Sequence, residues 1–173
     1  MKHHAAVSVA ILTVSDSAIA GTRADSSGPA LADACAQRGW HVAAKAVVPD
    51  EIRAIADQLR EWADAKIAAL LLTTGGTGVA ARDVTPEATR SVIEREIPGI
   101  AELMRMRGLE QNRFAVLSRA IAGSRKQALI VNLPGSPAGA VYSLAAIAHL
   151  VPHVVQLLAG DTEHTPPGPG SGN

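Results

Sequence analysis

The stretch IAALLLTTGGTG, residues 67–78, joins an apolar run directly to a glycine-rich loop. Seven residues, 67–73, are long enough for a buried strand, and the glycines mark its end. If neighbouring runs of this kind form parallel strands, their carboxyl ends share one edge of a sheet, where ligands bind in open α/β sheets. The pattern therefore predicts both a fold and a site. Three further apolar runs also end in a polar motif: 7–14 before Ser15-Asp16-Ser17, 41–48 before Pro49-Asp50-Glu51, and 127–132 before Leu133-Pro134-Gly135-Ser136-Pro137.

Helical patterns alternate with these runs, and Thr85 fits the N-cap of the third helix. Strand–helix alternation gives right-handed βαβ units, so the expected fold class is α/β, with a mostly parallel sheet and helices on both faces. The helices are expected over 30–39, 50–65, 86–96 and 99–110, and from Pro137 to a break at Pro152.

The segment 114–132 departs from this alternation. Two apolar runs, 114–120 and 127–132, flank Ala122-Gly123-Ser124-Arg125-Lys126. This arrangement predicts a hairpin that adds an antiparallel edge strand to the sheet. This segment also carries basic side chains, in Ser118-Arg119 and in Arg125-Lys126. They either contact phosphates or lie in solvent on that hairpin.

Composition limits the classes of function. The 173 residues suit one domain, which we place at 5–160, followed by a flexible Pro/Gly-rich tail at 161–173. Lys and Arg total 16 and so do Asp and Glu, so bulk charge does not favour nucleic-acid binding. No export signal or membrane-spanning run is visible, and a cytoplasmic location is expected. Cys35, the only cysteine, fits a small core residue.

The loop TTGGTG has neither the Gly-Lys-Ser/Thr of a P-loop nor the spacing of the dinucleotide fingerprint. Glycines after a strand nevertheless let backbone N–H groups converge on an anion. The hydroxyl groups of Thr74 and Thr77 could add donors. The alternative is a tight turn between a strand and a helix that binds nothing.

Two aspartates at the same edge of the sheet strengthen the prediction of a ligand site there. Asp50 follows a strand, although it also fits the N-cap of the next helix. Asp83 follows the glycine loop, and because Thr85 already fits the cap there, Asp83 needs another role. Two carboxylates beside a phosphate-binding loop suit Mg²⁺, which takes one or two carboxylates together with substrate phosphates. Asp16 and Asp25 are further candidates.

Eight motifs in this order resemble the molybdopterin adenylyltransferases, the MogA/MoaB-type proteins and the G domain of gephyrin and its plant counterpart. The resemblance spans about residues 5–160, and GGTG and RDVTPEAT are its most specific parts. The motifs are SDS (15–17), DSSGP (25–29), VPDE (48–51), TTGGTG (73–78), RDVTPEAT (82–89), PGIAELMR (98–105), LSRAIAG (117–123) and NLPGSP (132–137).

The resemblance implies a three-layer α/β/α fold, usually a homotrimer, and possible contact with other enzymes of molybdenum cofactor synthesis. The implied reaction transfers AMP from ATP to the terminal phosphate of molybdopterin and releases pyrophosphate, with Asp50 and Asp83 as catalytic carboxylates and Mg²⁺ ligands. It also implies substrate-binding positions at Ser15, Asp16, Ser17, Thr74, Gly75, Gly76, Thr77, Gly78, Ser118, Pro134, Gly135 and Ser136.

Three alternatives stay open at this point. A MoaB-type member could bind molybdopterin without a main role in adenylylation. The same domain type resembles part of the competence-damage proteins, which cleave nucleotide pyrophosphates. A trimeric scaffold is the third alternative, because the gephyrin G domain also serves in assembly.

Overall fold

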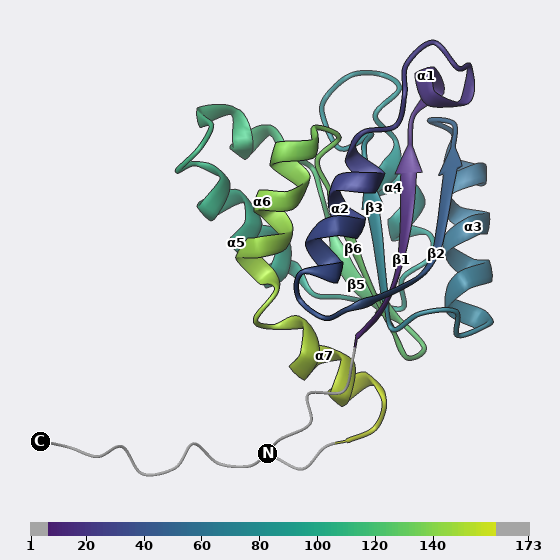
Figure 1. Cartoon of the computed structure of the whole chain (residues 1–173), viewed down its shortest axis with the longest axis vertical. Helices are drawn as coiled ribbons and strands as arrows, with labels where there is room; N and C mark the ends of the chain where they lie inside the picture. Colours follow the sequence, from purple (N-terminus) through teal and green to yellow (C-terminus); the bar gives the residue numbers. More distant parts are fainter. Residues whose placement is uncertain (1–6, 162–173) are drawn as a thin grey trace, which may run out of the picture.

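A six-stranded sheet lies between two layers of helices in the computed structural model, which describes residues 7–161 (Figure 1). The strand order is β2-β1-β3-β6-β5-β4. Strands β2, β1, β3 and β6 are parallel, whereas β5 is antiparallel to both of its neighbours. The expected α/β fold class is therefore confirmed. The strands are β1 (Ser8–Val14), β2 (His41–Val48), β3 (Leu70–Thr74), β4 (Arg95–Glu96), β5 (Ala122–Arg125) and β6 (Ala128–Leu133).

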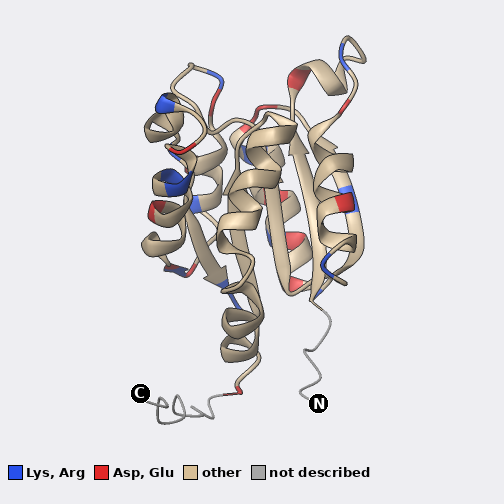
Figure 2. Cartoon of the chain, turned by 60° about the vertical axis from the view of Figure 1, so that its left-hand side comes forward, with Lys and Arg blue, Asp and Glu red and all other residues tan. Residues whose placement is uncertain are grey.

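Helices cover both faces of the sheet (Figures 1 and 2). Buried side chains of α2, α5, α6 and α7 pack on one face, and those of α3 and α4 pack on the other. The three expected layers are present. The helices are α1 (Asp16–Ile19), α2 (Ser27–Ala36), α3 (Ile52–Asp64), α4 (Thr85–Arg90), α5 (Pro98–Gly108), the 3-10 helix η1 (Arg113–Leu117), α6 (Pro137–Ile147) and α7 (Val151–Leu158).

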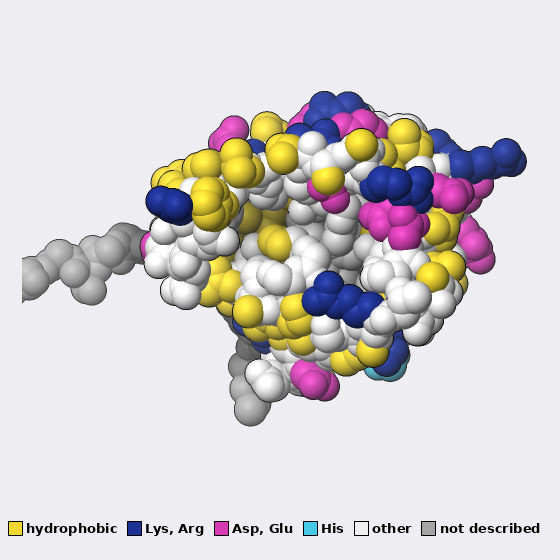
Figure 3. Space-filling model, turned by 90° about the horizontal axis from the view of Figure 1, so that it is seen from above, with side chains coloured by type: hydrophobic (Ala, Val, Ile, Leu, Met, Phe, Trp, Pro, Cys, Tyr) yellow, Lys and Arg dark blue, Asp and Glu magenta, His cyan; other side chains and the backbone are white. Residues whose placement is uncertain are grey.

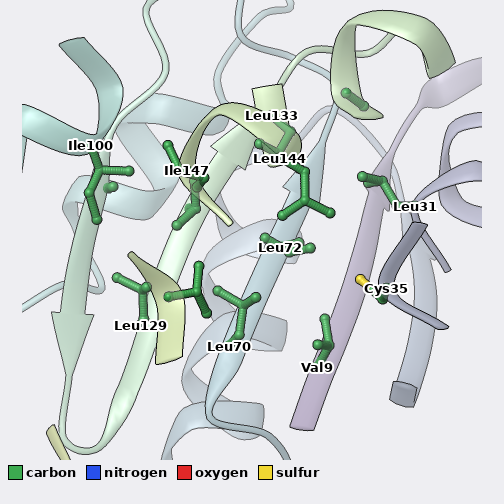
Figure 4. Close-up of a cluster of buried hydrophobic side chains, with 14 of the residues drawn as sticks. Val9, Leu31, Cys35, Leu70, Leu72, Ile100, Leu129, Leu133, Leu144 and Ile147 are labelled. Carbon is green, nitrogen blue, oxygen red and sulfur yellow. The ribbon is translucent and has the colours of Figure 1, made fainter. Parts of the chain in front are cut away.

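Successive residues of the central strands face opposite layers. Leu70 and Leu72 point toward α2 and α6, whereas Leu71 packs against α3 and α4. Because the central strands β1 and β3 are covered on both faces, they are almost continuously buried, and their apolar residues form runs rather than alternating with polar ones. Figure 4 shows the layer on the α2–α6 side, which is almost wholly aliphatic.

Cys35 belongs to this aliphatic layer, as predicted. Its side chain is fully buried on α2, and burial raises the pKa of its thiol to about 11. A thiol in this state is a packing group rather than a nucleophile.

The hairpin exists, but its first strand is not 114–120, and that prediction is wrong. Residues Arg113–Leu117 form η1, with Phe114 and Leu117 half exposed, and β5 begins only at Ala122. The turn therefore falls at Lys126, which has a φ of 50°, next to Gln127. The apolar residues of 113–117 face solvent or the adjoining groove described below, so their hydrophobicity did not report a strand.

Helix α4 is shorter than the expected 86–96. It ends at Arg90, and β4 at Arg95–Glu96 pairs with β5 at the edge of the sheet. Thr85 is not an N-cap either, because its hydroxyl donates to the carbonyl of Gly75 at 2.8 Å. The break before Pro152 is confirmed, with α6 ending at Ile147 and α7 starting at Val151.

The buried amide side chain of Asn132 joins four parts of the fold. The Asn132 amide donates to the hydroxyls of Thr73 on β3 and Thr89 on α4, at 3.0 and 2.8 Å, and its oxygen accepts from the backbone N–H of Ile121, next to β5. The Asn132, Thr73 and Thr89 side chains are fully buried. Since a buried amide is stable only when its partners are in place, Asn132 fixes the register of β6 against its surroundings.

No single helix within residues 7–161 has the length and apolar character to cross a membrane; α6 and α7 reach that length only together and are bent by 67° at the break between them. The expected tail lies outside the described residues, apart from residue 161.

Candidate functional site

A polar cleft of about 520 Å³ opens at the carboxyl ends of the parallel strands. Figure 3 looks onto this edge and shows the molecule hollowed at its centre. The chain leaves β1 toward α2 on one face and leaves the adjacent strand β3 toward α4 on the other, so the direction of winding changes between β1 and β3. Open α/β sheets bind ligands at such a point.

The glycine loop after β3 forms the floor of the cleft. Gly75 has a φ of +107°, and a β-carbon there would lie 2.3 Å from the Val14 carbonyl oxygen. Gly76 has a φ of +66°, and a β-carbon there would lie 2.3 Å from the Thr85 hydroxyl. Gly135, after β6, packs directly on the backbone of Gly75. These glycines are required by close backbone packing as well as by any ligand.

Asp50 is placed by Asp16 rather than by helix α3. Its Oδ2 accepts from the backbone N–H of Asp16 at 2.9 Å, and its own N–H donates to Asp16 Oδ1 at 2.9 Å. The N-cap position of α3 is Glu51, and no side chain caps it, so the N-cap alternative for Asp50 is wrong. Its Oδ1 is directed at the glycine loop, 3.2 Å from where a β-carbon of Gly76 would lie.

Asp83 sits on the other side of the same loop. Its Oδ2 accepts from the backbone N–H of Ala80 at 2.9 Å and would lie 2.7 Å from a β-carbon on Gly78. Asp83 therefore closes the turn that follows the glycines, and both aspartates face the glycine loop within one cleft.

Charge in the cleft is mainly negative. The carboxylates of Asp16, Asp25, Asp50 and Asp83 line it, and Arg23 is the one basic residue among the described lining residues. Burial raises the pKa of the Asp50 carboxyl, with Asp16 and Asp83 adding to the shift by repulsion. A polyphosphate in this cleft would meet like charge unless a cation accompanied it.

Asp16 is held in its ionised form by Arg82. The guanidinium donates to both carboxylate oxygens, at 2.7 and 2.9 Å, and these hydrogen bonds lower the pKa of Asp16. The pair links the first turn after β1 to the loop that carries Asp83. Asp25 is engaged locally, since its carboxylate accepts from the Thr13 hydroxyl and the Gly28 N–H at the start of α2.

A second, more apolar groove of about 600 Å³ adjoins the cleft and shares Ser136 with it. Helices α5 and α6 and the 3-10 helix η1 form its walls. Its lining includes Phe114 and Tyr142, which are the only phenylalanine and the only tyrosine in the sequence. Aromatic side chains in the wall of a groove suit a flat ring.

The structure brings most of the predicted site residues together, but not all in one hollow. Thr77 and Gly78 line neither hollow among the described residues, and the hydroxyl of Thr74 donates to the Pro134 carbonyl at 2.7 Å. Ser118 and Pro134 line the apolar groove, while the polar cleft is lined by Ser15, Asp16, Ser17, Asp50, Thr74, Gly75, Gly76, Asp83, Gly135 and Ser136.

Two arginines at the site differ from the expectation. Sequence reasoning missed Arg23, which lies in the irregular segment between α1 and α2 and lines the cleft, because no periodicity marks it. Arg119, expected on phosphates or in solvent, instead donates through its guanidinium to Gly78 O, Asp83 O and Glu87. Nothing in the sequence around Arg119 indicates these partners, since they lie on distant segments.

The chain belongs to the family described as "Probable molybdopterin binding domain", whose model matches residues 10–153. A curated relative, "Molybdopterin adenylyltransferase" of Helicobacter pylori strain J99, is 38% identical over 90% of this chain and 89% of its own length. The structure of "Molybdopterin biosynthesis enzyme MoaB" from Thermus thermophilus is 49% identical, covers 89% of this chain and 97% of that one, and has a TM-score of 0.84.

A longer relative is the "Molybdenum cofactor synthesis protein cinnamon" of Drosophila melanogaster, 37% identical over 90% of this chain. The chain spans only 26% of that protein, so the likeness concerns a single domain of it.

Proposed function

We propose that this chain is a molybdopterin adenylyltransferase that acts in molybdenum cofactor synthesis. The observation that carries the proposal is that Asp50 and Asp83, from loops after different strands, both face the glycine loop in one cleft. The name of the Helicobacter pylori relative, which matches 90% of this chain, agrees with it.

In the proposed reaction, an oxygen of the terminal phosphate of molybdopterin attacks the α-phosphorus of ATP. The bond from that phosphorus to the bridging oxygen breaks, and pyrophosphate leaves with the electron pair. The chain supplies no covalent nucleophile for this step. Its residues hold two anionic substrates in line, and such positioning is the main source of rate in phosphoryl-type transfers.

The carboxylates fit Mg²⁺ as a partner of the phosphates. One oxygen of each aspartate is engaged by backbone, and Asp50 Oδ1 and Asp83 Oδ1 accept no hydrogen bond from the described residues. Two oxygen ligands together with phosphate oxygens form the set that Mg²⁺ prefers. When bound, Mg²⁺ would neutralise charge on the phosphates. We assign its binding to Asp50 and Asp83.

The two hollows suit two substrates. The polar cleft, with the glycine loop and the carboxylates, fits the joined phosphates, and the groove beside Phe114 and Tyr142 fits a flat ring. Ser136, which lines both, lies at the junction. Its hydroxyl accepts from the Gly139 N–H at 3.2 Å, so the same residue begins α6 and borders both sites.

The test is product analysis with the purified chain. With ATP, Mg²⁺ and molybdopterin, we expect adenylylated molybdopterin and an equal amount of pyrophosphate, and neither product when molybdopterin is omitted. Release of pyrophosphate or AMP without molybdopterin would favour a nucleotide pyrophosphatase, and hydrolysis of ADP-ribose would support that assignment.

A second candidate is a MoaB-type protein that binds molybdopterin without a main role in adenylylation, which the 49% identity to a structure named MoaB favours. Calorimetry separates the two. Binding of both ATP–Mg²⁺ and molybdopterin, followed by product formation, supports the transferase, whereas molybdopterin binding without product supports the second candidate.

We further propose a homotrimer, located in the cytoplasm. On α5, Ile100 and Met104 are buried in this chain's own core. Met106, however, is 68% exposed on α5, and other exposed apolar side chains lie just after α5 and on η1, which packs beside it. A patch of this kind marks an association surface. The others are Leu109, Phe114, Val116 and Leu117.

Sedimentation velocity tests the trimer. We expect Leu117→Asp to shift the protein toward the monomer, while Ile67→Asp, at another exposed apolar position before β3, leaves its mass unchanged. A wild-type chain that sediments as a monomer at all concentrations would contradict the assembly.

A further inference from the structure

We infer that Arg119 is a positioning residue that holds Asp83 in place by joining both ends of the loop that carries it. The inference rests on the proposed function for its catalytic consequence, but its structural part stands on contacts alone. Those contacts connect Arg119 with the end of the glycine loop and with the start of α4.

The loop between Gly78 and Asp83 has little packing to hold it. Residues 79–82 are exposed, and Val79 is 71% exposed. Apolar burial therefore cannot set the position of this segment, and hydrogen bonds must do so. Within the loop, the Asp83 N–H donates to Ala80 O at 3.0 Å and the Asp83 carboxylate accepts from the Ala80 N–H.

Arg119 fastens the two ends of that loop to each other. Its backbone N–H donates to Thr77 O at 2.8 Å, and its Nε donates to Gly78 O at 2.7 Å. One terminal nitrogen donates to Asp83 O, and the guanidinium pairs with the Glu87 carboxylate in the first turn of α4. One side chain thus fixes the residue before the loop, the residue that ends it and the helix behind it.

This use of the guanidinium requires an arginine. The planar fork presents several N–H groups at fixed angles, so it can reach two carbonyls and a carboxylate at once. A lysine ammonium is a point charge on a flexible stem and cannot hold all three acceptors in that geometry. Because Arg119 does not line the cleft among the described residues, its effect on catalysis passes through Asp83.

The chain offers a matched control in Arg125. Its Nε and one terminal nitrogen donate to Asp64 at 2.9 Å each, and its other nitrogen donates to the Val92 carbonyl. The guanidinium of Arg125 therefore resembles that of Arg119 in donating to both a carboxylate and a backbone carbonyl. Arg125 pairs with Ala128 at the start of β6, at the opposite end of the sheet from the cleft.

The experiment compares Arg119→Lys with Arg125→Lys. For Arg119→Lys, we expect kcat to fall by about tenfold or more with a smaller change in KM for molybdopterin, since a misplaced group costs rate rather than binding. The Mg²⁺ concentration for half-maximal rate should rise. Arg125→Lys should keep wild-type values of all three quantities.

Amide hydrogen exchange, measured by NMR, supplies a readout that does not depend on activity. In Arg119→Lys, the Ala80 amide should exchange at least about tenfold faster, while amides of β1 and β3 keep wild-type protection. Wild-type exchange at Ala80 would overturn the inference, whatever the activity. A wild-type chain that forms no adenylylated product would overturn the proposed function and leave the exchange result to decide the role of Arg119.

Discussion

Asp16 and Asp50 exchange hydrogen bonds in both directions: each carboxylate accepts from the other's backbone N–H, at 2.9 Å. The exchange joins the loops after β1 and β2, which are 34 residues apart in the sequence. Because Arg82 then holds the Asp16 carboxylate, three loops meet through one pair of aspartates.

Asp50→Asn should remove catalysis while leaving this connection intact. The amide oxygen of asparagine still accepts from the Asp16 N–H, but the negative charge is lost. We expect the rate of adenylylated product formation to fall by about 10²-fold or more, the scale of a preorganised electrostatic contribution. Steady-state product analysis measures it, and near-normal turnover would contradict a catalytic role.

Asp83→Ala should lower adenylylation by about 10²-fold or more for the same reason. It also frees the Ala80 N–H, which is exposed, so the thermal midpoint should change little. Asp33→Ala, at an exposed position of α2, serves as the control and should retain wild-type rates. Equal rates for the two variants would rule out the proposed role of Asp83.

Gly76→Ala should destabilise the protein more than Gly39→Ala. Both glycines have positive φ, +66° and +73°, but a β-carbon on Gly39 meets nothing within 4 Å, whereas one on Gly76 meets the Thr85 hydroxyl at 2.3 Å. We expect about 1 kcal/mol for Gly39→Ala from backbone strain alone, and about 2–4 kcal/mol for Gly76→Ala. Urea unfolding of both variants tests the difference, and equal losses would contradict the close packing at Gly76.

Acid should weaken the fold partly through Asp64. Hydrogen bonds from Arg125 and Lys126 lower the pKa of Asp64 from 3.8 to about 2. A lowered carboxyl pKa contributes stability above the unfolded value, and that stability is lost as the pH falls toward 2. Between about pH 5 and pH 2, the free energy of unfolding should therefore fall less steeply for Asp64→Asn than for wild type. Equal slopes for the two chains would contradict this contribution of Asp64.

The parallel part of the fold could be predicted because its signals are local. Each central strand is a short apolar run that ends in glycine, proline or a polar motif, and these features come from burial on both faces of the sheet. Pro137 and Ser136 likewise mark the start of α6 through their own chemistry, and the Ser136 hydroxyl accepts from the Gly139 N–H as a cap should.

The segment 113–125 could not be predicted in the same way. Phe114, Val116 and Leu117 are apolar without being buried in this chain, so hydrophobicity did not separate a strand from an exposed 3-10 helix. Strand β5 contains Gly123 and Ser124, which have low strand propensity, and is held by its pairing with β6 and β4.

For the site, the sequence placed the aspartates and glycines at the correct edge because strand ends meet there. It could not show which groups hold them. The reciprocal contact between Asp16 and Asp50, and the contacts of Arg119 across to Asp83 and Glu87, join residues more than 30 positions apart. No local pattern in the chain encodes such partners.

Because the direction of winding switches between β1 and β3, the residues that stabilise the fold are separate from those that line the cleft. The bodies of these strands are buried and carry the core, whereas most of the polar groups that line the cleft lie on the connections just beyond them. A designer could therefore exchange the exposed segments 19–24 or 79–81 to alter which anions are accepted, while keeping the aspartates and the packed layers. The sheet would act as a fixed frame on which new specificities are assembled.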